Sequence, residues 1–193
     1  MGVPITFVEC QTSGYKARTK QNILETDGTL AIYVDGTTAG EKLTKLLALQ
    51  NKKPFFEFPL LDIFSASDVL HQIGNWLYEN HIFKLNVAGN GLYTFKRLLP
   101  KYNQSDIDDL VDKILSKSVL GIDHIQSGGQ SGIDEAAIKY GINHGLETRV
   151  VAPKGWIYRD EYNVDHSGKA KFHKRFMSHI VGAAEGADTP ERD

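Results

Sequence analysis

The chain has 193 residues, a hydrophobic fraction of 41% and a net charge of −2, which are ordinary values for a globular protein with a real core. This charge provides no overall basic field, which makes nucleic acid an unlikely partner, and no apolar run is long enough to span a membrane. Cys10 is the single cysteine, which excludes an internal disulfide, and the first residues lack the pattern of a signal peptide. We therefore expect a cytoplasmic protein with one domain over residues 1–181 and a disordered tail over residues 182–193.

Apolar runs of strand length alternate along the chain with stretches of helical periodicity. The apolar runs predict strands at residues 5–10, 29–34, 55–58, 81–89, 119–125 and 147–152. The clearest helix follows Ser105, whose successors include apolar residues at helical spacing, and another helix is predicted over residues 135–144. Residues 92–102 are ambiguous, residues 156–167 predict a loop, and a terminal helix carries Phe172 and Phe176.

Strands that alternate with helices imply right-handed crossovers and a parallel sheet. The sequence thus predicts an α/β fold, a Rossmann-like parallel sheet of about five to six strands with helices on both faces. Ligands of such sheets bind beyond the carboxyl ends of the strands. Glycine turns follow four of the predicted strands, at Gly36, Gly89, Gly128–Gly129 and Gly155, so we expect these turns to lie along one edge.

The most informative of these turns joins the strand at 119–125 to the helix at 135–144. A glycine-rich turn before a helix directs backbone N–H groups and the positive end of the helix dipole at one spot, which favours phosphate. The alternative is a tight turn that needs glycine for its backbone alone. Asp134 would repel phosphate, but it could cap the helix or accept a hydrogen bond from a ribose hydroxyl. The candidate ligand-binding residues of this stretch are Ser127, Gly128, Gly129, Gln130, Ser131, Gly132 and Asp134.

Further candidates lie near the other turns. Thr37, Thr38 and Gly40 could form a second anion contact at a helix start, although ordinary capping by threonine explains them equally well. Gly89 and Asn90 follow the strand at 81–89. The cations expected to meet a bound anion are Lys154 and Arg18, and the alternative for each is a solvated surface charge.

Aromatic and histidine residues near the C-terminus are candidates for ligand and metal binding. Trp156, Tyr158 and Tyr162 could stack on a base as a lid, although aromatic residues in a loop more often pack against the domain. The histidines His166, His173 and His179 follow no zinc-binding spacing. We expect no metal and no cofactor.

Three stretches of the chain resemble the putative molybdenum carrier family, within the wider group of SLOG-type Rossmann-like proteins. SGGQSGIDEAAIKYGINHG, with APKG downstream, resembles the family's SGGQTG helix and CPKG turn. Tyr15-x-x-Arg18-Thr19-x-x-Asn22 with DGTL is similar to a second family pattern. Asn75-Trp76-Leu77 leading to LNVAG is similar to a third, and together the three stretches cover most of residues 3–155.

The order of these stretches differs from the order in the family. There the SGGQ motif comes first and LNVAG last, whereas here the chain reaches SGGQ only at Ser127. The resemblance therefore implies a circular permutation, with residues 90–120 as the new connector between the halves. The chain also departs from the family after LNVAG, where Asn90-Gly91-Leu92-Tyr93 replaces Pro-Arg-Glu-Ser.

The resemblance implies a protein that binds a nucleotide or a nucleotide-derived phosphorylated small molecule, as a sensor, carrier or sequestering agent. Several SLOG-type domains recognise ADP-ribose-like signals, so an ADP-ribose-like molecule or a cyclic nucleotide is the first ligand to expect. Oligomers are common in this group, and we expect a homodimer or higher homo-oligomer.

Two other functions stay open. The first is a hydrolase that cleaves a nucleotide at its glycosidic or phosphoester bond, with Asp27, Glu25 or Asp134 as acid–base groups. SLOG-type phosphoribohydrolases carry an assisting glutamate where this chain places Thr44, which counts against the same chemistry. The second is an interaction module whose glycine turns are purely structural.

Overall fold

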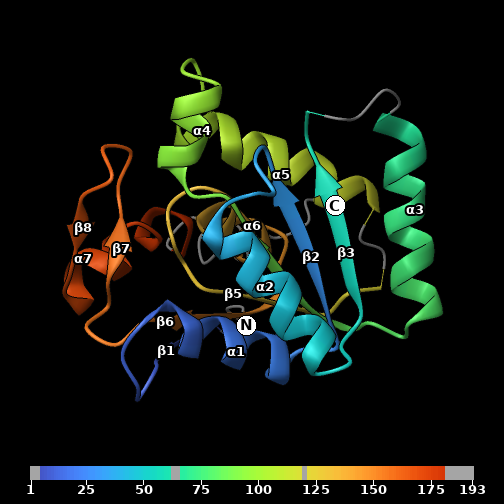
Figure 1. The fold of residues 1–193 in the computed structure, drawn as a ribbon, viewed down its shortest axis with the longest axis horizontal. Coiled ribbons are helices and arrows are strands. Elements are labelled where there is room, and N and C mark those ends of the chain that lie inside the picture. The colour runs from blue at the N-terminus through green and yellow to red at the C-terminus, as the bar shows by residue number, and fades with distance from the viewer. Residues whose placement is uncertain (1–4, 62–65, 119–120, 181–193) are drawn as a thin grey trace, which may run out of the picture.

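The computed structural model, which describes residues 5–61, 66–118 and 121–180, contains a six-stranded parallel sheet with helices on both faces (Figure 1). The sheet order is β1-β6-β5-β4-β2-β3, and all neighbouring strands are parallel. The predicted α/β fold class is therefore confirmed. The strands are β1 (Ile5–Glu9), β2 (Gly28–Tyr33), β3 (Phe55–Pro59), β4 (Lys84–Gly89), β5 (His124–Ser127) and β6 (Glu147–Ala152).

The helices form two layers around this sheet. The first two helices contact each other on one face, whereas the third, fifth and sixth are linked by contacts on the other face. A short antiparallel hairpin, β7 (Tyr158–Arg159) and β8 (Asp165–His166), lies beside the last helix (Figure 1). The helices are α1 (Tyr15–Glu25), α2 (Ala39–Gln50), α3 (Ala66–Glu79), α4 (Leu92–Leu98), α5 (Gln104–Ser118), α6 (Ile133–Asn143) and α7 (Lys169–Lys174).

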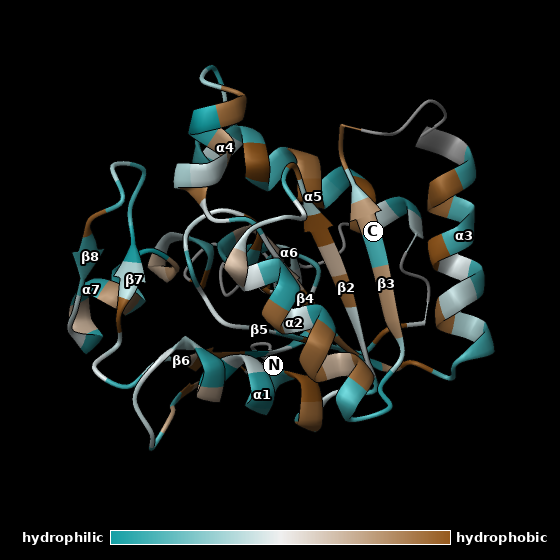
Figure 2. Ribbon diagram, viewed as in Figure 1, coloured by the Kyte–Doolittle hydropathy of each residue, from teal (hydrophilic) through white to brown (hydrophobic). Residues whose placement is uncertain are grey.

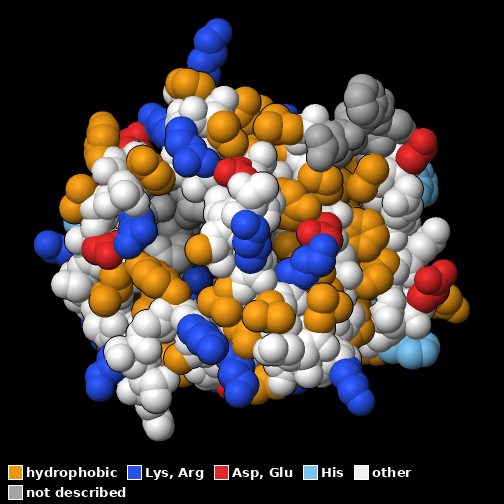
Figure 3. Space-filling view, viewed as in Figure 1, with side chains coloured by type: hydrophobic (Ala, Val, Ile, Leu, Met, Phe, Trp, Pro, Cys, Tyr) orange, Lys and Arg blue, Asp and Glu red, His pale blue; other side chains and the backbone are white. Residues whose placement is uncertain are grey.

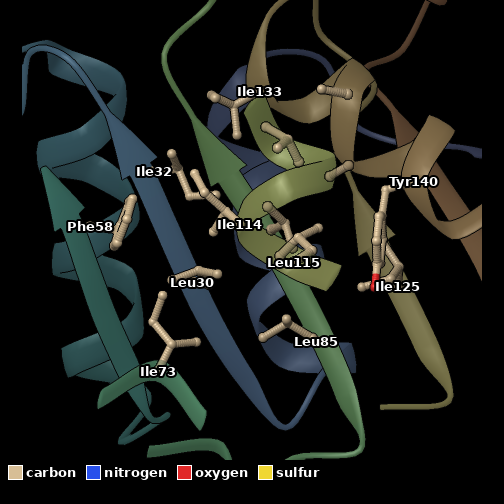
Figure 4. Packing of buried hydrophobic residues seen from close by; sticks show 14 of the residues in the cluster. Leu30, Ile32, Phe58, Ile73, Leu85, Ile114, Leu115, Ile125, Ile133 and Tyr140 are labelled. Carbon is tan, nitrogen blue, oxygen red and sulfur yellow. The ribbon is translucent and has the colours of Figure 1, made fainter. Parts of the chain in front are cut away.

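The main apolar core lies between the sheet and the layer of α3, α5 and α6. Alternate residues of the central strands, such as Leu85 and Ile125, point into it and are fully buried (Figure 4). Leu115 of α5 and Ile133 of α6 pack against them from the helix side. Figure 2 shows β2 as largely hydrophobic, as expected for a strand that is covered on both faces.

The opposite face of the same strands carries polar side chains beneath α1. Asn86 donates through Nδ2 to Thr29 Oγ1 at 3.1 Å, and Gln126 donates through Nε2 to Asn22 Oδ1 at 3.0 Å. All four residues are buried. A buried polar layer of this kind is costly unless its groups are hydrogen-bonded, so its presence within the sheet points to a requirement other than packing.

Three local predictions need correction or completion. β5 spans His124–Ser127 rather than 119–125. Polar His124 and Gln126 lie within the strand, so the apolar run alone does not mark its position. Residues 121–123 precede the strand, and residues 119–120 lie outside the described residues. The predicted loop at 156–167 contains the β7–β8 hairpin, whose strands are too short for a period-two pattern. The ambiguous stretch at 92–102 begins with α4.

The predicted tail at 182–193 lies outside the described residues, and the domain boundaries stay a prediction. Among the helices of the described residues, none is both long and apolar enough to cross a membrane.

Candidate ligand-binding site

A cavity of about 400 Å³ opens at the carboxyl ends of β2, β4 and β5. Its walls come from α1, from the first turns of α2, from the residues that follow β4, from the glycine turn after β5, and from the β7–β8 hairpin. Figure 3 shows the molecule hollowed between α2 and the hairpin. This is the edge at which parallel α/β sheets bind ligands.

The structure brings nine of the fourteen predicted binding residues to this cavity. They are Arg18, Thr38, Gly40, Gly89, Asn90, Gly128, Gln130, Ser131 and Asp134. The other five do not line it. They are Thr37, Ser127, Gly129, Gly132 and Lys154.

Two of these five residues have structural roles at the glycine turn. Ser127 is fully buried, and its hydroxyl donates to Val87 O at 2.6 Å, which ties β5 to β4. Gly129 has a φ of 66°, and an added Cβ would lie 2.6 Å from Phe172, so this glycine is required by backbone conformation and by packing.

The remaining three are explained by local structure. The N–H of Gly132 donates to Gln104 Oε1 at 2.6 Å. Thr37 donates through both its N–H and its hydroxyl to Asp35 Oδ1, in the turn before α2. Lys154 is exposed and lies away from the cavity, which agrees with a solvated surface charge.

Arg18 lies directly against the glycine turn. An added Cβ on Gly128 would lie 1.5 Å from Arg18 Nη1, so the close approach requires glycine at this position. The same Nη1 pairs with Asp134 Oδ2 at 2.6 Å, and both side chains are largely buried. The backbone N–H groups of Gly128, Gln130 and Ser131 have no hydrogen-bond acceptor among the described residues. The turn therefore offers a guanidinium and free N–H donors at one place.

The N-terminus of α6 contributes less to an anion site than the sequence suggests. The N–H of Ile133 donates to Asn90 O at 3.2 Å, and the N–H of Glu135 donates to Gln130 O at 2.9 Å. These groups are therefore occupied by the protein itself. Of the first turn only Asp134 has an N–H without an acceptor among the described residues, so most of the free donors belong to the turn before the helix.

Asn90 and Thr38 shape the other wall. Asn90 Oδ1 accepts from the N–H groups of Val34 and Asp35 at 2.9 and 2.8 Å, which clamps the loop after β2 to the end of β4. Thr38 is the N-cap of α2, and its hydroxyl accepts from the N–H of Glu41 at 3.4 Å. Thr38 thus performs the ordinary capping that is the alternative to anion binding, whereas Thr37 is bonded to Asp35 in the preceding turn.

Glu41 lines the cavity and was missed by the sequence reasoning. Burial, reinforced by the nearby carboxylates of Asp134 and Asp35, raises the pKa of Glu41 to about 7. It forms no ion pair with a described cation. The Thr38-x-x-Glu41 spacing, which is that of a capping box, was the available signal that a glutamate occupies the first turn of α2. Thr44, in contrast, donates its hydroxyl to Gly40 O at 2.9 Å.

Of the three acid–base candidates, only Asp134 lies at the cavity. Asp27 accepts from the N–H groups of Phe83 and Lys84 at the amino ends of the strands, the opposite edge of the sheet. Glu25 accepts from Gln126 at 3.1 Å, beneath α1.

The aromatic residues that were candidates for a lid do not line the cavity. Trp156 is buried against Phe172, and the ring of Tyr158 lies 4.0 Å from the Arg175 guanidinium. Tyr162 is 77% exposed and does not line the cavity. Tyr15 and Tyr93 are the tyrosines at its wall.

The β7–β8 hairpin is fastened to the glycine turn by two side chains. Gln130 donates to Ile157 O at 2.9 Å and accepts from the N–H of Arg159 at 3.0 Å. The Ser131 hydroxyl donates to Arg159 O. The polar side chains of the turn therefore hold the wall of the cavity, and the guanidinium of Arg159 is paired with Asp165.

The sheet order and the cavity at its carboxyl edge define a Rossmann-like α/β protein with a candidate small-molecule site. Residues 5–96 match the family model described as the circularly permutated YpsA SLOG family. This match confirms the resemblance to a circularly permuted SLOG-type protein, and the glycine turn at 128–132 lies outside the matched residues.

Among solved structures, the chain is similar to one titled putative molybdenum carrier protein from Syntrophus aciditrophicus SB. The sequence identity is 27% and the TM-score is 0.48, over 60% of this chain and 78% of that one. No curated protein matches the chain.

Proposed function

We propose that this protein binds a nucleotide or a nucleotide-derived phosphorylated small molecule in the cavity, as a sensor, carrier or sequestering protein. The observation that carries the proposal is the placement of the Arg18 guanidinium on Gly128, next to three backbone N–H groups without acceptors. A guanidinium and converging N–H donors are the groups that bind phosphate oxygens in proteins.

The volume and the position of the cavity agree with this proposal. Its 400 Å³ falls within the range of small-molecule pockets, and it lies where the carboxyl ends of three parallel strands meet. ADP-ribose-like molecules and cyclic nucleotides are the first candidates, in keeping with the ligands of SLOG-type domains. A cytoplasmic homodimer or higher homo-oligomer is part of the same proposal.

A second candidate function is hydrolysis of the nucleotide at its glycosidic or phosphoester bond. One observation favours it: a carboxyl group with a pKa of about 7 at the cavity can transfer protons at neutral pH. Chromatography of ADP-ribose after incubation with the protein separates the two functions, because a binding protein leaves the nucleotide intact.

Thermal unfolding with and without nucleotide tests the binding proposal. ADP-ribose or 3′,5′-cyclic AMP at about one hundred times its Kd should raise the Tm by roughly 5–10 °C. Gly128→Ala should abolish the shift, because the new Cβ displaces the Arg18 guanidinium from the turn.

Gly74→Ala is the matched control, since its Cβ would meet only Ser118 O at 3.4 Å, on the far side of the sheet from α1. The Tm of each variant without nucleotide reports whether it is folded. The proposal is overturned if no nucleotide raises the Tm, or if the Gly128→Ala protein responds as the wild type does.

A further inference from the structure

Besides the donors of the glycine turn, the cavity has unfilled acceptor capacity. Glu41 enters from α2 and Asp134 from α6, so two carboxyl groups face the same space from different helices. Asn86 lines the cavity from β4; it is 2% exposed, and its Oδ1 has no hydrogen-bond partner among the described residues. A buried acceptor without a donor costs free energy, so its retention at a cavity wall indicates a ligand that supplies the donor.

The two carboxyl groups differ in their partners. Asp134 uses Oδ2 for Arg18, and its other oxygen makes no hydrogen bond to a described residue. Glu41 has no cation beside it and faces the carboxylates of Asp134 and Asp35. Phosphate placed against Glu41 would meet like charge, whereas hydroxyl groups would donate to both carboxyl groups.

The donors that a nucleotide can offer to such a pair are the vicinal hydroxyl groups of a ribose. Carboxylates accept from ribose hydroxyls in many dinucleotide-binding sites, where the phosphate lies on the neighbouring glycine turn. The same elements exist here, because Arg18 and the free N–H groups lie at the turn, Asp134 lies beside Arg18, and Glu41 lines the same cavity from α2.

We propose that Glu41 and Asp134 accept hydrogen bonds from the 2′- and 3′-hydroxyls of one ribose of the ligand, with Asn86 accepting a further N–H or O–H donor. This inference rests on the proposed nucleotide binding and adds the part of the ligand that is recognised. A 3′,5′-cyclic nucleotide, whose 3′-oxygen carries no proton, is disfavoured relative to ADP-ribose.

Calorimetric titration with ADP-ribose and two analogues tests the inference. One analogue lacks the 2′- and 3′-hydroxyls of the adenosine ribose, and the other lacks those of the terminal ribose. One of the two should bind roughly 10- to 100-fold more weakly than ADP-ribose, as expected for the loss of hydrogen bonds to charged acceptors. Glu41→Gln should weaken ADP-ribose binding and reduce that ratio, whereas Glu79→Gln, an exposed residue at the end of α3, should change neither.

The direction of the pH dependence gives a second readout. Ionised Glu41, which faces the Asn90 side chain and the carboxylates of Asp134 and Asp35, is the better acceptor, so ADP-ribose should bind more tightly at pH 8 than at pH 6. Phosphate against Glu41 would give the opposite trend. Failure of ADP-ribose to bind overturns nucleotide binding itself, whereas equal binding of ADP-ribose and both analogues overturns only the ribose contact.

Discussion

Ionisation of the Glu41 carboxyl group costs the folded protein free energy. Burial raises its pKa from 4.5 to about 7, so the folded state holds this proton more tightly than the unfolded state does. The contribution of Glu41 to stability is therefore most favourable below about pH 4.5 and falls as the pH rises through 7. A carboxyl group with a shifted pKa at the wall of a cavity is typical of functional sites.

Glu41→Gln should remove this pH dependence, because glutamine stays neutral. At pH 8 the variant should be more stable than the wild type by about 3 kcal/mol, and at pH 5 the difference should fall to about 1 kcal/mol or less. Urea unfolding at the two pH values measures both differences, with Glu79→Gln as the exposed control. A difference of the same size at pH 5 and pH 8 would contradict the assignment.

Some features of the site could be predicted from sequence because their physical cause is local. Gly128 and Gly129 lie in a turn whose backbone conformation and close contacts exclude side chains. Such turns require glycine and can therefore be recognised in the sequence. The pairing of Arg18 with Asp134 joins residues 116 positions apart, and the sequence indicated only that Arg18 lies near a turn and matches a family pattern. The unpartnered Asn86 oxygen depends on which face of β4 meets α1, which no local pattern reveals.

At the scale of elements, α7 is fastened to the glycine turn by one buried arginine. Arg175 pairs with Glu135 of α6 at 2.7 Å and donates to Gly129 O. Its guanidinium lies 4.0 Å from the ring of Tyr158 and 4.6 Å from that of Phe172. The arginine thus joins the hairpin, α7 and the turn, and it supports the wall of the cavity without lining it.

Arg175→Met should cost about 3 kcal/mol of unfolding free energy, because it leaves Glu135 buried with Lys139 as its remaining partner. Lys45→Met is the matched control, since the Lys45–Glu57 pair is solvent-exposed and should be worth less than about 1 kcal/mol. Urea denaturation of both variants measures the contrast. Equal losses would mean that Arg175 contributes no more than a surface ion pair.

Sequence patterns predict the long elements of this fold but not the short ones. Long elements such as α5 and β2 are predicted well, because their apolar residues repeat over several turns or form a continuous run. The hairpin strands have two residues each, which is too short to give a periodic pattern in the sequence. They are held by the Arg159–Asp165 pair and by Gln130. Their position follows from tertiary contacts.

At the scale of the whole molecule, segments that lie far apart in the sequence meet at the cavity. The chain reaches the glycine turn late, yet β5, which precedes this turn, lies at the centre of the sheet beside β4. The cavity therefore collects segments from the beginning, the middle and the end of the described chain. A ligand bound there would contact all of them at once.

Hydrogen exchange with and without ADP-ribose should reveal this convergence. Binding stabilises the segments that contact the ligand, so protection should rise together in residues 15–22, 38–44, 86–94, 128–134 and 159–163, which contain the residues that line the cavity. The exposed side of α3, which has no residue at the cavity, is the internal control and should exchange at an unchanged rate. Gly128→Ala should remove the protection in all five segments, because the variant loses the anion contact that holds the ligand. Protection confined to one of these segments, or centred on α3, would show that the nucleotide binds elsewhere on the protein.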